Sequence, residues 1–142
     1  MRAQQAGLTL IELMVVVAVM AIVTAIAYPL YTTQTQKARR ADAKIALETI
    51  AMAQERAYTV AGRYHLLSAG TLQLQLPTAL QSGDSNQGYY AITVTQGSAQ
   101  DFTATATPKS AGAQGGDAGK CASFSIDHLG AKSSTGSASN CW

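Results

Sequence analysis

The chain has 142 residues, of which 47% are hydrophobic, and a formal net charge of +2. This length accommodates one domain plus an apolar anchor, but not two domains. The near balance of acidic and basic side chains gives no broad electrostatic footprint for nucleic acid.

An apolar run follows a glycine near the N-terminus and contains a single carboxylate. No formally charged side chain lies between Glu12 and Lys37. A helix over residues 13–36 would be roughly 36 Å long, which is enough to cross a hydrocarbon core of about 30 Å. The run therefore predicts a membrane-spanning helix, most apolar over residues 13–30, with one unexplained charge at its start.

The polar residues 1–6 fit the part of an insertion signal that stays in the cytoplasm. Cleavage at a weak small-x-small site, residues 25–27, would discard the charged start of the run. Cleavage after Gly7 would instead leave the apolar helix on the mature protein, with a free amine on Leu8.

The segment Gly7-Leu8-Thr9-Leu10-Ile11-Glu12 resembles the class III signal of type IV pilins and pseudopilins. The resemblance implies that a peptidase cuts after Gly7, that Leu8 is then methylated, and that Glu12 acts in filament assembly. The family usually has phenylalanine where this chain has Leu8. Among pilins, the chain is most similar to the PilE-type minor pilins of Gram-negative bacteria. The similarity covers most of the chain and continues through Ala27-Tyr28-Pro29, residues 39–43, Tyr58-Thr59, Gly62, Tyr64, Cys121 and Cys141.

The charge of Glu12 is costly in the uncut chain and favourable in the cut one. A charge at the bilayer centre costs about 2.5–3.5 kcal/mol on insertion scales. An ammonium about 4 Å away, at an effective dielectric near 20, attracts a carboxylate by roughly 4 kcal/mol before desolvation. We expect Glu12 to pair with the Leu8 amine of a neighbouring subunit and so to fix the stagger between helices. The alternatives are that Glu12 reaches the lipid headgroups or pairs within its own chain.

Pro29 lies inside the helical run, where it removes a backbone donor and its ring opposes the carbonyl of Ala25. The sequence predicts a kink or a local weak point there. The resemblance implies that the helix bends at this proline and can lose helicity inside a filament, and a kink with no further role is the alternative.

Beyond the apolar run, residues 43–57 have apolar side chains at spacings of three and four, which predicts an amphipathic helix. We expect one continuous helix from about Leu10 to about Val60, ended by Gly62. Its solvated stripe is expected to hold Lys37, Arg40, Lys44, Glu48 and Glu55, with Arg39, Asp42 and Arg56 beside it. Arg39 and Arg40 are expected to be solvated or to pair with an acid such as Asp42 of a neighbour.

Alternation of apolar and polar side chains predicts strands over residues 89–95, 101–107 and 121–127, and a more polar edge strand over 131–135. The first two strands form a hairpin. Residues 61–87 predict a tethered loop with at most a short strand or helical turn. The Gly- and Ala-rich residues 108–120 predict a flexible loop.

Cys121 and Cys141 are the two cysteines of a chain that begins with an export signal. We therefore expect an oxidising compartment and one disulfide, with two free thiols as the alternative. Closing a loop of about 20 residues would stabilise the fold by roughly 3 kcal/mol. The bridge would hold the C-terminal loop against the sheet.

The sequence contains no pattern that predicts a catalytic residue, a cofactor or a metal. His65 and His128 lack a nucleophile or ligand arrangement and are expected to be surface or turn residues. Residues 115–120 resemble a phosphate loop only superficially, because Gln114 and Cys121 stand where that loop needs glycine and serine or threonine. The aromatic side chains are expected to pack the domain.

The sequence thus predicts an α+β fold: a long N-terminal α-helix, a membrane span in its first half, packed by its second half on a four-stranded antiparallel β-sheet. Residues 1–7 are the expected leader, 8–36 the hydrophobic anchor and filament core, and 37–142 the periplasmic or extracellular globular domain.

The resemblance implies a non-enzymatic structural subunit of a type IV pilus, minor rather than major. It would be stored in the inner membrane of a Gram-negative-type bacterium and assembled into the pilus, supporting pilus assembly, adhesion or twitching motility. Implied partners are other pilin subunits, the prepilin peptidase and methylase, and the inner-membrane assembly platform. The alternatives are a type II secretion pseudopilin and a bitopic periplasmic sensor or binding domain. The charge neither supports nor excludes capture of DNA.

Overall fold

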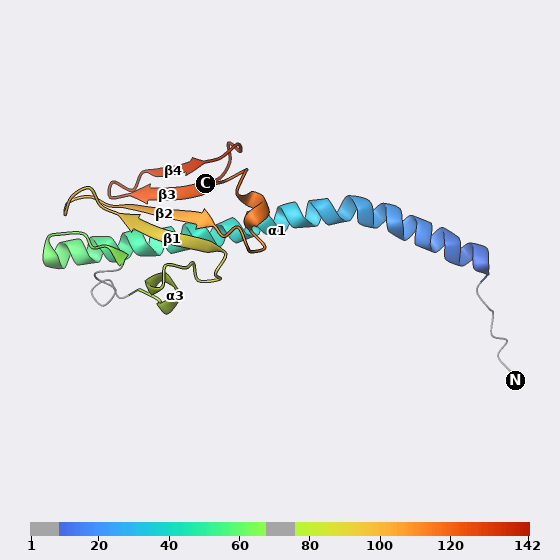
Figure 1. Cartoon of the computed structure of the whole chain (residues 1–142), viewed down its shortest axis with the longest axis horizontal. Coiled ribbons are helices and arrows are strands. Elements are labelled where there is room, and N and C mark those ends of the chain that lie inside the picture. Colours follow the sequence, from blue (N-terminus) through green and yellow to red (C-terminus); the bar gives the residue numbers. More distant parts are fainter. Residues whose placement is uncertain (1–8, 68–75) are drawn as a thin grey trace, which may run out of the picture. The chain divides into compact units, whose positions relative to one another are not determined.

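The computed structural model describes residues 9–67 and 76–142 (Figure 1). Gly7 and Leu8, where processing is predicted, lie outside these residues. The chain divides into two compact units, Met1–Thr35 and Gln36–Trp142.

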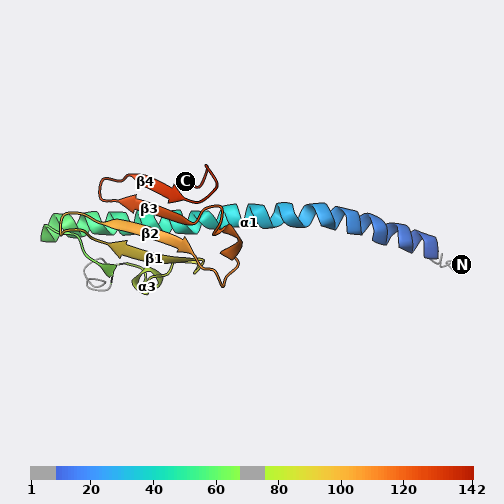
Figure 2. The ribbon, with the colours of Figure 1, turned by 45° about the horizontal axis from the view of Figure 1, so that its top comes forward.

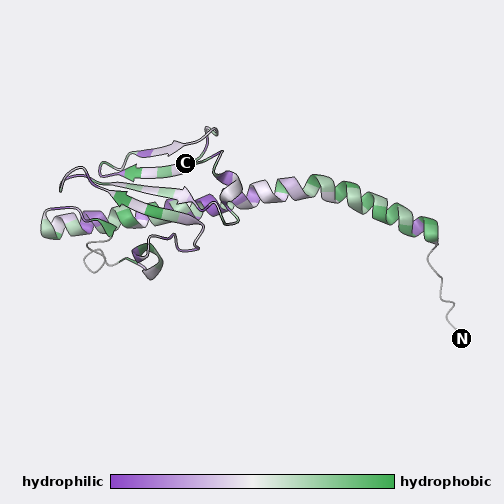
Figure 3. Cartoon of the chain, viewed as in Figure 1, coloured by the Kyte–Doolittle hydropathy of each residue, from purple (hydrophilic) through white to green (hydrophobic). Residues whose placement is uncertain are grey.

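Helix α1 spans Leu10–Ala61 without interruption, which confirms the predicted single helix. Its first part is long and apolar enough to cross a membrane, and Figure 3 colours most of this part as hydrophobic. The large apolar side chains from Leu10 to Tyr31 are all exposed. Exposed apolar surface on this scale is unfavourable in water and needs lipid or other helices around it. The helix ends where predicted, because Gly62 has a φ of 67° and donates its N–H to the Tyr58 carbonyl at 2.8 Å.

The four antiparallel strands that the alternation predicted form one sheet, and their order in it is β1-β2-β3-β4. The strands are β1 (Tyr90–Thr95), β2 (Thr103–Pro108), β3 (Ser123–Asp127) and β4 (Lys132–Thr135). Figure 2 shows them side by side along the second half of α1. Two aspartates close the turns. Asp101 accepts the N–H groups of Gly97 and Ser98 at 2.7 and 2.9 Å, and Asp127 accepts those of Leu129 and Ala131 at 2.9 and 2.8 Å.

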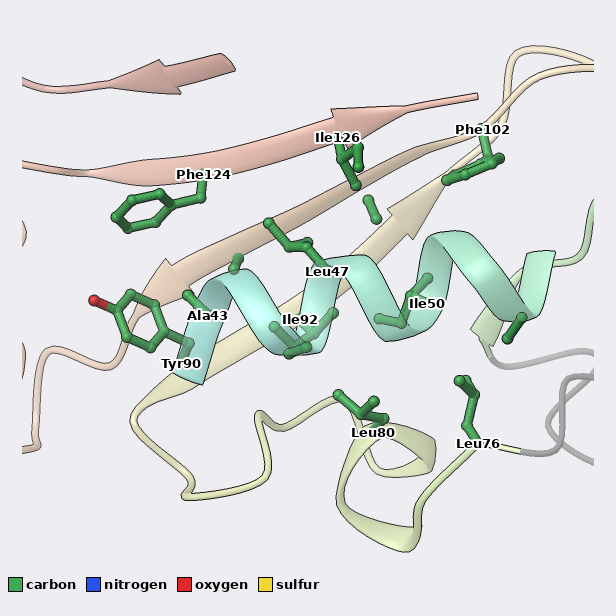
Figure 4. Close-up of a cluster of buried hydrophobic side chains, with 14 of the residues drawn as sticks. Ala43, Leu47, Ile50, Leu76, Leu80, Tyr90, Ile92, Phe102, Phe124 and Ile126 are labelled. Atoms are coloured by element: carbon green, nitrogen blue, oxygen red, sulfur yellow. The ribbon is translucent and has the colours of Figure 1, made fainter. Parts of the chain in front are cut away.

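The core of the globular unit lies between α1 and the inner face of the sheet (Figure 4). Alanines on α1 let the backbones approach closely, and larger side chains fill the space between them. Leu76 and Leu80 add to this core from the segment that contains the short helix α3 (Thr78–Gln81), which is the helical turn expected between residues 61 and 87. The buried side chains shown include Ala43, Leu47, Ile50, Tyr90, Ile92, Phe102, Phe124 and Ile126.

The outer face of the sheet is made almost entirely of small hydroxyl side chains. The strand registers align Thr93, Thr105, Ser125 and Ser133 in one row across all four strands. Ser125 and Ser133 share a hydrogen bond of 2.7 Å, as do Ser123 and Thr135. Within the strands, Ala91 and Asp127 are the only outward-facing residues that are not serine or threonine.

Two expectations about polar residues are wrong. Arg40, expected in the solvated stripe, and Asp42, expected beside it, are buried at 8% and 5% exposure. The segment expected to be a flexible loop contains the 3-10 helix η1 (Gly115–Asp117), and the Asp117 side chain is fully buried. Arg40 and Asp117 are buried for one reason, which is that the loop supplies an acid that lets the helix bury an arginine. Asp42 instead accepts the Gln87 N–H at 3.1 Å.

Candidate functional site

The start of α1 carries Glu12 in the first helical turn. The Thr9 hydroxyl accepts the Glu12 N–H at 3.3 Å, and the Thr9 carbonyl accepts the Leu13 N–H at 3.2 Å, so Thr9 caps the helix. Sequence reasoning missed this cap, although Thr9-x-x-Glu12 is the capping-box pattern. The positive end of the helix dipole also favours a carboxylate at this position.

Pro29 lies within the continuous α1, so the Ala25 carbonyl lacks its usual helical donor. The hydroxyls of Thr32 and Thr33 both donate to the Pro29 carbonyl, at 3.0 and 2.9 Å. Threonines that bond to the preceding turn in this way satisfy their own hydroxyls in an apolar environment.

In the globular unit, Arg40 of α1 and Asp117 of η1 form a buried bidentate ion pair. Arg40 Nε lies 2.8 Å from Asp117 Oδ2, and Arg40 Nη2 lies 2.6 Å from Oδ1. The hydrogen bond to Asp117 raises the pKa of Arg40 above its ordinary value, against the opposing effect of burial. Helical spacing could have placed Arg40 here, because it lies three and seven residues before the buried Ala43 and Leu47.

Gln114 extends this network towards the sheet. Its amide nitrogen lies 3.0 Å from Asp117 Oδ2, 2.9 Å from the Tyr90 hydroxyl and 3.1 Å from the Gln36 carbonyl. Burial, and then the negative charge of Asp117, raise the pKa of Tyr90 to about 12. Helix α1, strand β1 and the β2–β3 loop therefore meet through one buried set of polar groups.

The predicted disulfide joins Cys121 to Cys141, and both residues are buried. The tail that it closes runs along the end of the β2–β3 loop. The N–H of Ala138 donates to the Lys120 carbonyl at 2.9 Å, and that of Ser137 donates to the Gly119 carbonyl at 3.2 Å. We call residues 136–142 the terminal segment.

The terminal segment ends in Trp142, which lies between α1 and β4. Its indole N–H donates to the Ser133 carbonyl, and its ring packs edge-on against Phe124, with centroids 5.9 Å apart. Lys132 Nζ lies 5.0 Å and Lys44 Nζ 6.0 Å from the centre of the indole ring. Trp142 is only half-buried, so an aromatic ring and two cations share one partly exposed position.

The two histidines have different surroundings, and the expectation of a surface or turn position is wrong for one of them. His65 is buried, whereas His128 is half-buried in the β3–β4 turn.

Burial, followed by the hydrogen bond that Tyr64 donates to Glu55, raises the pKa of Tyr64 to about 12. Residues 9–67 and 76–142 hold no group of three His, Cys, Asp or Glu side chains that could bind a metal ion.

The charged side chains of the globular unit are unequally engaged. All its acidic side chains accept a hydrogen bond or an ion pair within the unit: Asp42, Glu48, Glu55, Asp84, Asp101, Asp117 and Asp127. Only three of its basic side chains have an acidic partner within 4.0 Å in the described part of the chain, namely Arg40, Lys109 and Lys132. A carboxylate that accepts a hydrogen bond from a neutral donor keeps its charge, so six basic and four acidic side chains of the unit lie outside these three ion pairs.

A long helix packed on a four-stranded antiparallel sheet, with a disulfide closing the C-terminal segment, is the fold of the type IV pilins. A family model described as "Type IV minor pilin ComP, DNA uptake sequence receptor" matches residues 29–125, and a second, "Prokaryotic N-terminal methylation motif", matches residues 2–28. The first match covers more than half of the chain, and the chain belongs to this family of type IV minor pilins.

A solved structure supports the fold. The non-core minor pilin PilV of Neisseria meningitidis aligns with a TM-score of 0.53 and 18% sequence identity, over 76% of this chain and 94% of that one. The predicted minor-pilin resemblance is confirmed, and the family consists of structural subunits rather than enzymes. The methylation motif and the apolar helix are consistent with an inner-membrane and pilus location.

Proposed function

We propose that this chain is a DNA-receptor subunit of a type IV pilus. It is cut after Gly7, methylated at Leu8, held in the inner membrane by residues 8–36 and assembled with other pilin subunits so that residues 37–142 are displayed. The observation that supports DNA binding is the family match over residues 29–125, because that family is described as a DNA uptake sequence receptor. For the same reason DNA uptake, rather than adhesion or twitching motility, is the role proposed.

The charge distribution of the globular unit agrees with this role. DNA is a dense row of phosphates, and lysine and arginine side chains that neutralise them supply much of the affinity. The net charge of the chain is small, but the three ion pairs of the globular unit leave six of its cations and only four of its carboxylates outside such pairs. A modest net charge is therefore compatible with a surface that attracts phosphate.

The surface best suited to DNA borders the terminal segment. Lys44 and Lys132 flank Trp142, although Lys132 is also ion-paired with Glu48, and Lys120 precedes the disulfide-bonded Cys121. Lysines in this arrangement can bind phosphates, and the partly exposed indole can contact a sugar or a base. We propose that these four residues, Lys44, Lys120, Lys132 and Trp142, form the DNA-contacting surface.

The direct test is a selection from a random duplex library with the full-length protein in nanodiscs. Enrichment of one short sequence, with tighter binding than a scrambled duplex of the same composition, is the expected result. Binding should weaken steeply as salt is raised, because counterions are released from the phosphates. Equal affinity for all duplexes would contradict a receptor role, and no binding at low salt would contradict DNA binding altogether.

Assembly is proposed to depend on Glu12, which the cap at Thr9 fixes in the first helical turn. Glu12→Gln should be processed normally but enter sheared filaments poorly. Glu48→Gln, the same change on the globular unit, should enter them normally. Unimpaired incorporation of Glu12→Gln would exclude the register role. Gly7→Asp should leave an uncut membrane protein, and normal filaments from that variant would refute the cleavage site.

We propose that α1 loses helical structure around Pro29 when it enters the filament, because one helical hydrogen bond is missing there. Amide hydrogen exchange of the filament should be fastest within a turn of Pro29 and slower in Pro29→Ala. Equal protection in the two proteins would leave Pro29 with no role beyond shaping the helix.

A further inference from the structure

Arg40 contacts both chain segments that the disulfide joins. On one side it forms the bidentate pair with Asp117, four residues before Cys121. On the other side its Nη1 lies 3.4 Å from the carbonyl of Asn140, the residue before Cys141. One side chain of α1 therefore reaches the β2–β3 loop and the terminal segment together.

The Asp117 side of this contact is rigidly linked to the disulfide. The Asp117 carbonyl accepts the N–H groups of Lys120 and Cys121 at 2.9 and 2.8 Å. Holding the Asp117 carboxylate thus also fixes the backbone of Lys120 and the first cysteine. The disulfide ties the two segments to each other, but it does not attach either of them to α1.

A buried ion pair is weak evidence for stability, because desolvation of both charges offsets their attraction. What a bidentate pair supplies is a defined geometry, since the planar guanidinium fixes both the distance and the orientation of the carboxylate. The side chains of Arg40 and Asp117 are 10% and 0% exposed, so solvent does not relax that geometry. By contrast, Lys132 and Glu48, which also link α1 to the sheet, are about half-exposed.

We infer that Arg40 is a positioning residue for DNA binding. Through Asp117 and Asn140 it sets where the terminal segment lies on α1, and so holds Trp142 between Lys44 and Lys132. This inference rests on the proposed function, because it assigns a role within the proposed DNA-contacting surface. Arg40 itself is too buried to bind phosphate.

Trp142 is the sole tryptophan of the chain and reports directly on the terminal segment. The experiment compares wild-type protein in nanodiscs with Arg40→Lys, which keeps the positive charge but loses the planar guanidinium that makes the bidentate contact. For each protein we would measure the emission wavelength of Trp142, the melting temperature, and the affinity for a short duplex of the selected sequence. Asp84→Asn, which breaks the ion pair to Lys109 elsewhere in the unit, is the matched control.

In Arg40→Lys, we expect red-shifted Trp142 emission and roughly tenfold weaker DNA binding, because a binding site that is loosened by about an ångström loses much of its complementarity. Asp84→Asn should change neither. The double variant Arg40→Met/Asp117→Leu separates an effect on DNA binding from an effect on folding, because apolar replacement of both partners preserves stability in other proteins. It should fold, form the disulfide and still bind DNA weakly.

Wild-type affinity and unshifted emission in a folded Arg40→Lys or in the double variant would overturn the inference and leave the proposed function intact. A loss of affinity that the lower melting temperature fully explains, with unshifted Trp142 emission, would also overturn the inference. An ion pair that only stabilises the fold would have that effect. A wild-type protein that binds no duplex would overturn the proposed function, and this inference with it.

Discussion

The side chain of Gln54 forms two hydrogen bonds with the backbone of His65. The Gln54 amide donates to the His65 carbonyl, and its own carbonyl accepts the His65 N–H at 2.9 Å. Gln54 is fully buried on α1. The Gln54 amide thus pairs with the His65 backbone as a neighbouring strand would. It holds the segment that follows Gly62 against α1.

Replacing Gln54 with leucine should lower the free energy of unfolding by about 2–3 kcal/mol. The leucine fills the space but leaves the buried N–H and carbonyl of His65 without partners. Urea denaturation followed by circular dichroism measures this. Gln87→Leu, at an exposed position, should change stability by no more than about 0.5 kcal/mol. Equal stability of the two variants would mean that water replaces the Gln54 amide.

Trp142→Ala should destabilise the globular unit by about 2 kcal/mol, because it removes the ring that packs on Phe124 and the donor to Ser133. Trp142→Phe keeps an aromatic contact and should lose only about 1 kcal/mol, the net value of a hydrogen bond. Urea midpoints of the two variants give the comparison. Identical losses would assign the whole contribution of Trp142 to its indole N–H.

The stability of the globular unit should fall above pH 10 because of Tyr90. The pKa of Tyr90 is raised to about 12 in the folded protein, mainly by burial, whereas an unfolded tyrosine titrates near 10. The folded state therefore retains a proton that the unfolded state releases, and its advantage is lost as the pH rises from 10 to 12.

Urea denaturation at a series of pH values, with Tyr90→Phe as the reference, isolates this effect. The stability advantage of wild type over Tyr90→Phe should shrink by about 2–3 kcal/mol between pH 10 and pH 12. A difference that stays constant would show that Tyr90 titrates normally. Tyr64, whose pKa is raised in the same direction, is present in both proteins and cancels.

Lys44→Gln and Lys132→Gln should each weaken binding to all duplexes similarly and reduce the salt slope of log K by about 1. Arg56→Gln is the control. Arg56 is another cation of α1 and is exposed, but it lies roughly 18 Å along the helix from Lys44 at 1.5 Å per residue. An equal effect of Arg56→Gln would show that DNA contacts a broader surface than the one proposed.

The elements of the fold were predictable because their signals are local. The apolar run, the spacing of Ala43, Leu47 and Ile50, and the alternation from Tyr90 to Ile126 each specify an element from neighbouring residues. The disulfide followed from there being two cysteines in an exported chain. The processing and assembly roles of Gly7, Leu8, Glu12 and Pro29 remain predictions, since they concern steps outside the folded chain.

The buried polar network was not predictable in the same way, because its partners lie far apart in the sequence. Arg40 and Asp117 are 77 residues apart, so although helical spacing places Arg40 on the apolar face of α1, nothing near it in the sequence indicates its acidic partner. Gln114 was missed for the same reason, because it bonds to Tyr90 and Gln36, which lie 24 and 78 residues away. Only the fold reveals that a Gly- and Ala-rich loop contains the one acid that can neutralise an arginine on the buried face of the helix.

The hydroxyl face of the sheet has a consequence for the electric field around the molecule. Serine and threonine carry no formal charge, so the only formal charge on this broad face of the strands is that of Asp127 in its last row. The field that a distant phosphate feels is then set by the margins of the sheet and by α1, where the lysines and arginines lie. A single lysine placed at Thr105, in the middle of β2, would change that field without touching the core.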